Sequence, residues 1–228
     1  MRKIVVAIDG PAAAGKSTVA KKVAKLLKCT YIDTGAMYRA ITYFAIKSNV
    51  NPENEEDVVA LLPQIDLILK PNGKVILNEE DVTQVIRTPA VSGNVSYVAS
   101  YKAIRLHLVE LQRKMASSIS VVMDGRDIGT YVLPDADVKI FQVASVETRA
   151  YRRHKENLQH GIKCSLEDIE AELRKRDFID SSRTFAPLKP ASDSIILDTS
   201  DLTIDQAVEA VMKVVKDKGY DLESLNER

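Results

Sequence analysis

Short apolar runs alternate with amphipathic, helix-like segments along most of the chain. Between the runs apolar residues recur at helical spacing, and near 101–117 this stripe consists of Ile104, Leu108, Leu111 and Met115. Continuous apolar runs are typical of strands buried on both faces, and strands separated by helices are typical of parallel sheets. The pattern predicts an α/β fold, a doubly wound parallel sheet with helices on both faces. Its five strands are expected near residues 3–8, 30–33, 120–124, 138–143 and 194–198.

One region between the second and third strands breaks this alternation. Apolar segments at 66–70 and 74–78 surround Pro71-Asn72-Gly73, which is a strong signal for a β-hairpin. Antiparallel strands do not belong in a doubly wound parallel sheet. Residues from about 62 to 92 are therefore expected to form a small inserted lobe with its own antiparallel sheet.

Composition narrows the classes of protein that the chain can belong to. Its 228 residues are 45% hydrophobic and 28% charged, with a formal net charge of zero, so no global field favours nucleic acid or membrane. Cys29 and Cys164 lie far apart, without the histidine spacing of a zinc site, and predict neither a disulfide framework nor a metal centre. No apolar segment reaches transmembrane length. We expect a cytoplasmic protein, and nothing in the sequence requires more than a monomer.

The segment Gly10–Ser17 reads GPAAAGKS and matches the phosphate-binding P-loop pattern at every fixed position. A chance match on a surface turn is the alternative, but an apolar strand precedes the loop and a helical pattern follows it, as the motif requires. Lys16 is expected at the β- and γ-phosphates, and Ser17 at Mg²⁺. The predicted ATP-binding residues of this loop are Gly10, Pro11, Ala12, Ala13, Ala14, Gly15, Lys16, Ser17 and Thr18.

Several arginines follow the predicted strands or end the charged helical segment. They are Arg39, Arg126, Arg176 and Arg183. Each one alone is consistent with a solvated surface arginine. Ligands in parallel sheets bind at the carboxyl ends of the strands, where these residues and the P-loop are expected to meet, and the planar guanidinium suits a phosphate group. Together with the P-loop, they predict clamps for a second anion.

From Val146 to about Asp180 the chain is predicted to be helical, rich in charge and interrupted at Gly161. Its first helix carries a cluster of arginines: Arg149, Arg152 and Arg153. The cluster has two interpretations of equal weight. It is either a solvated face paired with Glu147 and Glu156, or a lid that closes on a triphosphate.

Three aspartates, Asp33, Asp124 and Asp127, end predicted strands. Aspartate at such positions often caps a helix or a turn. It can instead accept hydrogen bonds from a substrate or support a metal. The apolar run into Asp124 resembles a Walker B strand, whose aspartate supports Mg²⁺. Either Asp33 or Asp124 could support the ion through water, and the sequence does not separate capping from binding.

Motifs along nearly the whole chain resemble those of bacterial cytidylate kinases, in the form with an insertion in the monophosphate-binding lobe. The matching segments are IDGPAAAGKST at 8–18, YIDTGAMYR at 31–39, VIRT at 85–88, DGRDIGT at 124–130, PDADVKIF at 134–141, RAYRR at 149–153, KRD at 175–177 and RTFAPL at 183–188. The family's pattern has more charge where Phe178 and Ile179 stand. The resemblance implies a single P-loop nucleoside-monophosphate-kinase-like domain. Its parts would be a core (1–33, 118–145 and 184–228), a monophosphate-binding lobe (34–117) and a helical lid (about 146–183).

The resemblance implies ATP-dependent phosphorylation of CMP and dCMP to CDP and dCDP, with Mg²⁺, in pyrimidine nucleotide metabolism. Arg39, Arg126 and Arg183 would hold the CMP phosphate. Cytosine would be read by Ser96, Arg105 and Asp127, and the ribose would be held by Arg176 and Asp180. Thr34 and Asp124 would also lie on the CMP side, and Arg149 and Arg153 would close over ATP. Lys16, Arg126, Arg153 and Arg183 would act in catalysis.

Three alternatives use the same P-loop differently. Another small acceptor, such as UMP, AMP or shikimate, would suit the same scaffold. A nucleotide switch would need Asn-Lys-x-Asp and Asp-x-x-Gly motifs, which the sequence lacks. An ATPase that binds nucleic acid is disfavoured by the balanced charge and the lack of an aromatic stacking platform.

Overall fold

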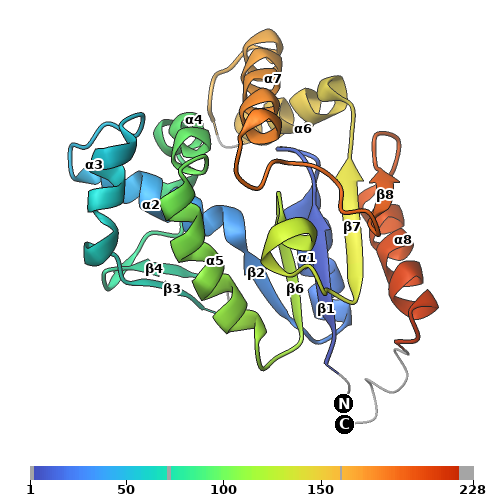
Figure 1. Ribbon diagram of the computed structural model, residues 1–228. Helices are drawn as coiled ribbons and strands as arrows, with labels where there is room; N and C mark the ends of the chain where they lie inside the picture. Colours follow the sequence, from blue (N-terminus) through green and yellow to red (C-terminus); the bar gives the residue numbers. More distant parts are fainter. Residues whose placement is uncertain (1–2, 71–72, 160, 221–228) are drawn as a thin grey trace. The chain divides into compact units, whose positions relative to one another are not determined.

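The predicted parallel sheet is confirmed by the computed structural model, which describes residues 3–70, 73–159 and 161–220 (Figure 1). Its strands have the order β2-β6-β1-β7-β8, and β1 pairs in parallel with both β6 and β7. The strands are β1 (Val5–Asp9), β2 (Thr30–Asp33), β6 (Val121–Gly125), β7 (Val138–Val143) and β8 (Ile195–Asp198). Because β1 lies between β6 and β7, residues that follow all three strands are brought to one edge.

The chain divides into two compact units, and the larger one comprises Met1–Thr30 and Ile119–Arg228. In this unit α1 and α8 pack together beside the sheet, while α6 and α7 pack against each other (Figure 1). Its helical elements are α1 (Lys16–Leu26), the π-helical turn η3 (Ile128–Val132), α6 (Val146–Gln159), α7 (Leu166–Ser182) and α8 (Ile204–Asp217). The charged region therefore forms two helices, as expected. His160, which precedes the predicted break at Gly161, lies outside the described residues.

The smaller unit, Tyr31–Ser118, contains the predicted hairpin. Its strands β3 (Leu67–Leu69) and β4 (Val75–Leu77) pair antiparallel, and β5 (Glu80–Asp81) adds a third strand that the pattern did not indicate. Pro71 and Asn72 of the predicted turn lie outside the described residues. The helical elements are α2 (Thr34–Lys47), α3 (Glu55–Ala60), η1 (Leu62–Gln64), η2 (Val85–Arg87), α4 (Pro89–Val98) and α5 (Lys102–Ala116).

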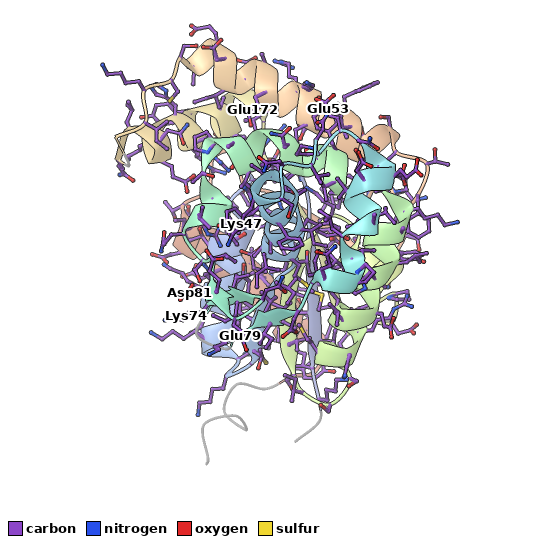
Figure 2. All side chains as sticks on the ribbon, turned by 90° about the vertical axis from the view of Figure 1, so that its left-hand side faces the viewer. Lys47, Glu53, Lys74, Glu79, Asp81 and Glu172 are labelled. Atoms are coloured by element: carbon purple, nitrogen blue, oxygen red, sulfur yellow. The ribbon has the colours of Figure 1, made fainter. Side chains whose placement is uncertain are left out.

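The small sheet shares its hydrophobic core with the helices of its own unit. Buried Leu67, Val75 and Leu77 pack in one cluster with Ile41 of α2 and Leu108 of α5. Charged pairs lie at its rim. They include Lys47 with Glu80, and Lys74 with Asp81 at 3.2 Å, and Figure 2 shows Lys47, Lys74 and Asp81 on the face of this unit that is turned toward the viewer. Exposed pairs contribute little, so the shared core holds the insertion on α2.

Among the described residues, no helix is long and apolar enough to cross a membrane. Cys29 and Cys164 are both free thiols.

Candidate active site

The loop between β1 and α1 contains positive φ angles, which are unfavourable for residues with a β-carbon. Gly10 and Gly15 have φ angles of +146° and +89°, and Ala13 has a φ of +58°. A β-carbon at Gly10 would lie 1.9 Å from the Gln142 carbonyl oxygen of β7, so only glycine fits there. An alanine keeps a left-handed backbone conformation only where the surrounding structure enforces it. The loop is therefore held in one conformation from outside.

Carbonyl oxygens of this loop accept hydrogen bonds from surrounding side chains. Lys16 Nζ donates to the Pro11 carbonyl at 2.7 Å, Arg149 Nη1 to that of Ala12 at 3.1 Å, and Gln142 Nε2 to that of Ala14 at 2.6 Å. Among the residues that the structure describes, no side chain caps the N-terminus of α1, which begins at Lys16. Amides at an uncapped helix start, at the positive end of the helix dipole, are a ready site for an anion.

The Lys16 ammonium is buried beside other positive groups. Burial is the main cause that lowers its pKa well below the ordinary value, and the nearby Arg126 guanidinium lowers it further, while Asp124 and Asp9 oppose the shift. A buried ammonium in this setting is stabilised by a further negative charge. The loop thus combines amides and a cation suited to a polyphosphate.

Ser17 and Asp124 form a pair suited to a hydrated divalent cation. The Ser17 hydroxyl donates to Asp124 Oδ2 at 2.8 Å, and Asp124 is buried at the end of β6. Nowhere in the described part of the chain do three or more His, Cys, Asp or Glu side chains gather as a metal cage. Mg²⁺ needs no such cage, because it is commonly bound by one or two protein oxygens together with phosphates and water. The donor set therefore fits Mg²⁺.

Asp33, the other candidate for metal support, caps a helix as one alternative expects. Its carboxylate accepts from the Ala36 amide at 3.0 Å at the start of α2 and pairs with Arg87 at 3.0 Å. Asp124 already accepts from the Ser17 hydroxyl beside the phosphate-binding loop, so it is the better candidate for the metal.

Three of the predicted anion clamps lie around two buried carboxylates in the larger unit. Arg126 Nε lies 2.9 Å from Asp180, and Arg183 lies 3.6 Å from Asp180 and 3.8 Å from Asp127. Burial is the main cause that lowers the pKa of Arg176 to about 10, and Arg126 is the next cause. Three guanidinium groups thus face two carboxylates, Asp127 and Asp180. An anionic ligand would balance the excess positive charge.

Asp9 is a buried carboxyl group that the sequence analysis missed. It ends β1 and accepts from the Ile128 and Gly129 amides at 2.8 and 2.7 Å. Burial raises its pKa to about 7, although both hydrogen bonds lower it, and the negative charge of Asp127 raises it further. Asp9 therefore fixes the turn that carries Asp127. The only signal for it in the sequence is its position, directly before the glycine of the P-loop.

The arginines of α6 have the expected partners only in part. Arg153 pairs with Glu156 at 3.3 Å, as the solvated-face interpretation predicts, but Arg149 pairs with Asp177 at 2.6 Å. Glu147 pairs instead with Arg174 of α7, at 3.2 Å. Arg152 reaches the Thr199 carbonyl at 2.5 Å and the Ala14 carbonyl at 3.4 Å. The cluster is therefore divided between the solvated face and the phosphate-binding loop.

The remaining predicted residues lie in the smaller unit. Thr34 is buried at the start of α2, and Ser96 is buried on α4. Arg39 Nη1 donates to Ser92 Oγ at 2.7 Å. Arg105 is 1% exposed and donates to the Ala99 carbonyl at 2.8 Å.

An aromatic ring supports Arg105. Its guanidinium carbon lies 5.4 Å from the centre of the Tyr38 ring, a distance typical of cation–π contacts. The sequence predicted no role for Tyr38 or Ser92, although Tyr38 lies within the matched segment 31–39. Stacking and hydrogen bonding together fix the direction of a buried guanidinium.

Comparisons with known proteins give one consistent result. The sequence model of the family described as cytidylate kinase matches residues 6–217. A cytidylate kinase from Anoxybacillus flavithermus is 51% identical over 95% of this chain and 98% of its own length. One from Ligilactobacillus salivarius is 49% identical over 96% of this chain and all of its own. An uncharacterized protein from Eubacterium ventriosum shares the fold, with a TM-score of 0.52 and 14% identity over 95% of this chain and 99% of that one.

Proposed function

Because the chain belongs to the cytidylate kinase family, we propose that it transfers the γ-phosphoryl group of ATP to CMP and dCMP, giving CDP and dCDP. The observation that carries the proposal is that the larger unit holds two separate features suited to anions. One unit contains both a phosphate-binding loop with a buried lysine and a separate, positively charged cluster around Asp127 and Asp180. A kinase that joins two polyanions needs both features.

The reaction demands positioning and charge neutralisation more than proton transfer. The acceptor is a phosphate oxygen of CMP that is already largely ionised near neutral pH, so no histidine base is required. The barrier comes from repulsion between donor and acceptor and from the need for in-line geometry. Lys16 would neutralise charge on the donor, while Arg126 and Arg183 would do so on the acceptor. This chemistry accounts for the arginines gathered around Asp127 and Asp180.

Ser17 and Asp124 would hold Mg²⁺, with Asp124 acting directly or through water. The ion would supply positive charge at the β- and γ-phosphates of ATP. Asp33 is the weaker candidate because its carboxylate already accepts from Ala36 and pairs with Arg87. Magnesium and ATP are the only cofactor and donor that the proposal requires.

The CMP-binding roles are assigned residue by residue from the family. The phosphate is assigned to Arg39, Arg126 and Arg183, the ribose to Arg176 and Asp180, and cytosine to Ser96, Arg105 and Asp127, with Thr34 and Asp124 also on the CMP side. Each assignment transfers a family role to a matching position. The buried, supported guanidinium groups of Arg105 and Arg183 favour these roles, because an oriented arginine binds with little loss of side-chain entropy.

Base selection follows from hydrogen-bond complementarity. Cytosine offers an amine donor with N3 and O2 acceptors, and an aspartate together with an arginine complements this set. Uracil has a carbonyl oxygen in place of the amine, so its binding would set an oxygen against a carboxylate. A contact of this kind is worth about 1–3 kcal/mol, which corresponds to roughly 5- to 150-fold in kcat/KM.

The test is a panel of acceptors in an assay that couples ADP formation to NADH oxidation. CMP and dCMP should give the highest kcat/KM, UMP a lower value, and AMP and shikimate little turnover. Reactions without an acceptor measure ATP hydrolysis, which should be slow if binding of the acceptor completes the site. A higher kcat/KM with UMP or AMP than with CMP would overturn the assignment of the base-reading residues.

We propose further that the protein acts as a monomer in the cytoplasm, with ATP and CMP or dCMP as its partners and with no nucleic acid or membrane. Balanced charge and two free cysteines support this. Saturable binding to single-stranded DNA that stimulates ATP turnover would instead support the nucleic-acid-binding ATPase.

A further inference from the structure

The tip of the phosphate-binding loop packs against the two helices of the predicted lid. Ala12 is buried in a small apolar cluster with Ala150 of α6 and with Ile169 and Leu173 of α7. Figure 1 shows these two helices side by side. The next residue, Ala13, has the left-handed backbone described above. The helix pair therefore contacts the loop beside its left-handed alanine.

Arg149 adds a polar attachment at the same point. Its Nε donates to the Ala144 carbonyl at 3.0 Å, and its Nη1 donates to the Ala12 carbonyl at 3.1 Å. The side chain is only 4% exposed. One guanidinium thus ties the loop to the segment between β7 and α6.

Asp177 of α7 holds this guanidinium in place. Its two carboxylate oxygens accept from Arg149 Nη1 at 3.2 Å and from Nη2 at 2.6 Å, in the bidentate arrangement that fixes both partners. With the bonds to Ala144 and Ala12, four of the five N–H groups of Arg149 are engaged by the protein. A buried guanidinium without its carboxylate partner is unfavourable. Loss of Asp177 should therefore release Arg149 from Ala12.

We propose that Asp177 is a positioning residue for the phosphoryl donor. It acts through Arg149, which holds Ala12 and Ala13 in the conformation that leaves the loop amides available to phosphate. The family resemblance places Arg149 on ATP itself. The structure instead engages this side chain with the loop. Arg153, which pairs with Glu156 and is 30% exposed, is the better candidate for direct contact. The nature of the donor rests on the function proposed above.

The test compares Asp177→Asn with Glu170→Gln. Both variants replace a carboxylate of α7 by its amide, but Glu170 pairs with Arg174 at the exposed surface. Isothermal titration calorimetry would measure the dissociation constants of a non-hydrolysable ATP analogue and of CMP separately. Asp177→Asn should weaken the analogue about 10-fold or more, as expected for loss of a charge-assisted hydrogen bond, and change CMP affinity less than about twofold. Glu170→Gln should match the wild type in both.

A double-mutant cycle tests whether Asp177 acts through Arg149. Arg149→Lys keeps the charge but cannot bond Asp177 bidentately and Ala12 together. It should also weaken the analogue. The double variant should be no weaker than the worse single variant, because both changes break the same attachment. If Asp177→Asn does not fold, Arg149→Lys carries the same comparison between the two ligands.

Three results would overturn the proposal. They are unchanged affinity of Asp177→Asn for the analogue, an equal loss for analogue and CMP, and additive effects in the cycle. Failure of the proposed function looks different, because the wild type would then bind the ATP analogue but not phosphorylate CMP. In that case the analogue titrations alone still decide the role of Asp177.

Discussion

The hydroxyl of Ser17 donates a hydrogen bond to the carboxylate of Asp124 across 2.8 Å, although 107 positions separate the two residues. The contact joins the first turn of α1 to the end of β6. It exists because β1 and β6 are neighbours in parallel register, with Asp9 beside Gly125. A hydroxyl and a carboxylate at this distance suit a hydrated Mg²⁺, the ion that the proposed function requires.

Asp124→Asn should therefore weaken the response to magnesium. The amide keeps an acceptor for Ser17 but removes the negative charge that would attract the ion. We expect the Mg²⁺ concentration for half-maximal activity to rise about 10-fold or more at saturating ATP and CMP. Titrating activity against free Mg²⁺ measures this. Asp205→Asn, which removes a carboxylate from an exposed pair with Lys22, is the control and should leave the curve unchanged. An unchanged curve for Asp124→Asn would remove Asp124 from the metal site.

Alanine substitutions at two glycines should have opposite effects on the stability of the protein. A β-carbon at Gly10 would lie 1.9 Å from the backbone oxygen of Gln142. One at Gly93 in α4 would meet no atom of the described residues within 4 Å beyond its neighbours and the backbone of its own helix. Gly10→Ala should lower the free energy of unfolding by at least about 3 kcal/mol, because the backbone must shift. Gly93→Ala should raise it by about 0.5–1 kcal/mol, because alanine favours a helix. Urea denaturation of both variants measures the difference, and equal stabilities would show that the loop backbone can relax around a side chain.

The parallel sheet and the phosphate-binding loop are predictable because their signals are local. Apolar runs mark the buried strands, and the loop motif is contiguous. The helix α4 is less predictable, since its sequence PAVSGNVSYV contains a proline, a glycine and no clear polar stripe. The six-residue helix α3 is too short for a periodic pattern. These two helices form through packing in the smaller unit rather than through propensity.

The supporting residues of the site are hidden for a different reason. Gln142 lies 128 positions from the Ala14 carbonyl that it bonds, and Asp177 lies 28 positions from Arg149. Their roles depend on β7 lying beside β1 and on α7 packing against α6. A pattern along the chain does not specify which strands or helices are neighbours. Sequence motifs therefore point to residues that would touch substrate, whereas the structure adds those that hold them.

The raised pKa of Asp9 should make the stability of the protein depend on pH. Burial raises the pKa of its carboxyl group from 3.8 to about 7 in the folded protein. Between these values the folded state keeps a proton that the unfolded state releases, so the free energy of unfolding from this group falls as the pH rises. The full effect is on the order of a few kcal/mol. Asp9→Asn should remove this slope, and the difference in unfolding free energy between variant and wild type should shift in favour of the variant between pH 5 and pH 8.

The control for this measurement is Asp193→Asn. A hydrogen bond from Lys139 lowers the pKa of Asp193 below 3.8, so its titration lies below this window. Its difference from the wild type should be constant between pH 5 and pH 8. A constant difference for Asp9→Asn as well would mean that Asp9 is ionised throughout and that its two backbone hydrogen bonds outweigh burial.

Substitutions of Arg126 and Lys16 should affect the binding of acceptor and donor separately. Arg126 pairs with Asp180 at 2.9 Å, and Lys16 lies within the phosphate-binding loop. Arg126→Ala should weaken CMP about 100-fold, the scale of a bidentate arginine–phosphate contact, and leave the affinity for an ATP analogue within about twofold. Lys16→Ala should have the reverse pattern. Calorimetric titrations of both ligands check the two predictions, and Arg174→Ala, at the surface of α7, serves as the control. If both site variants lose thermal stability and keep both affinities, these residues are structural, and the assignment of donor and acceptor sides fails.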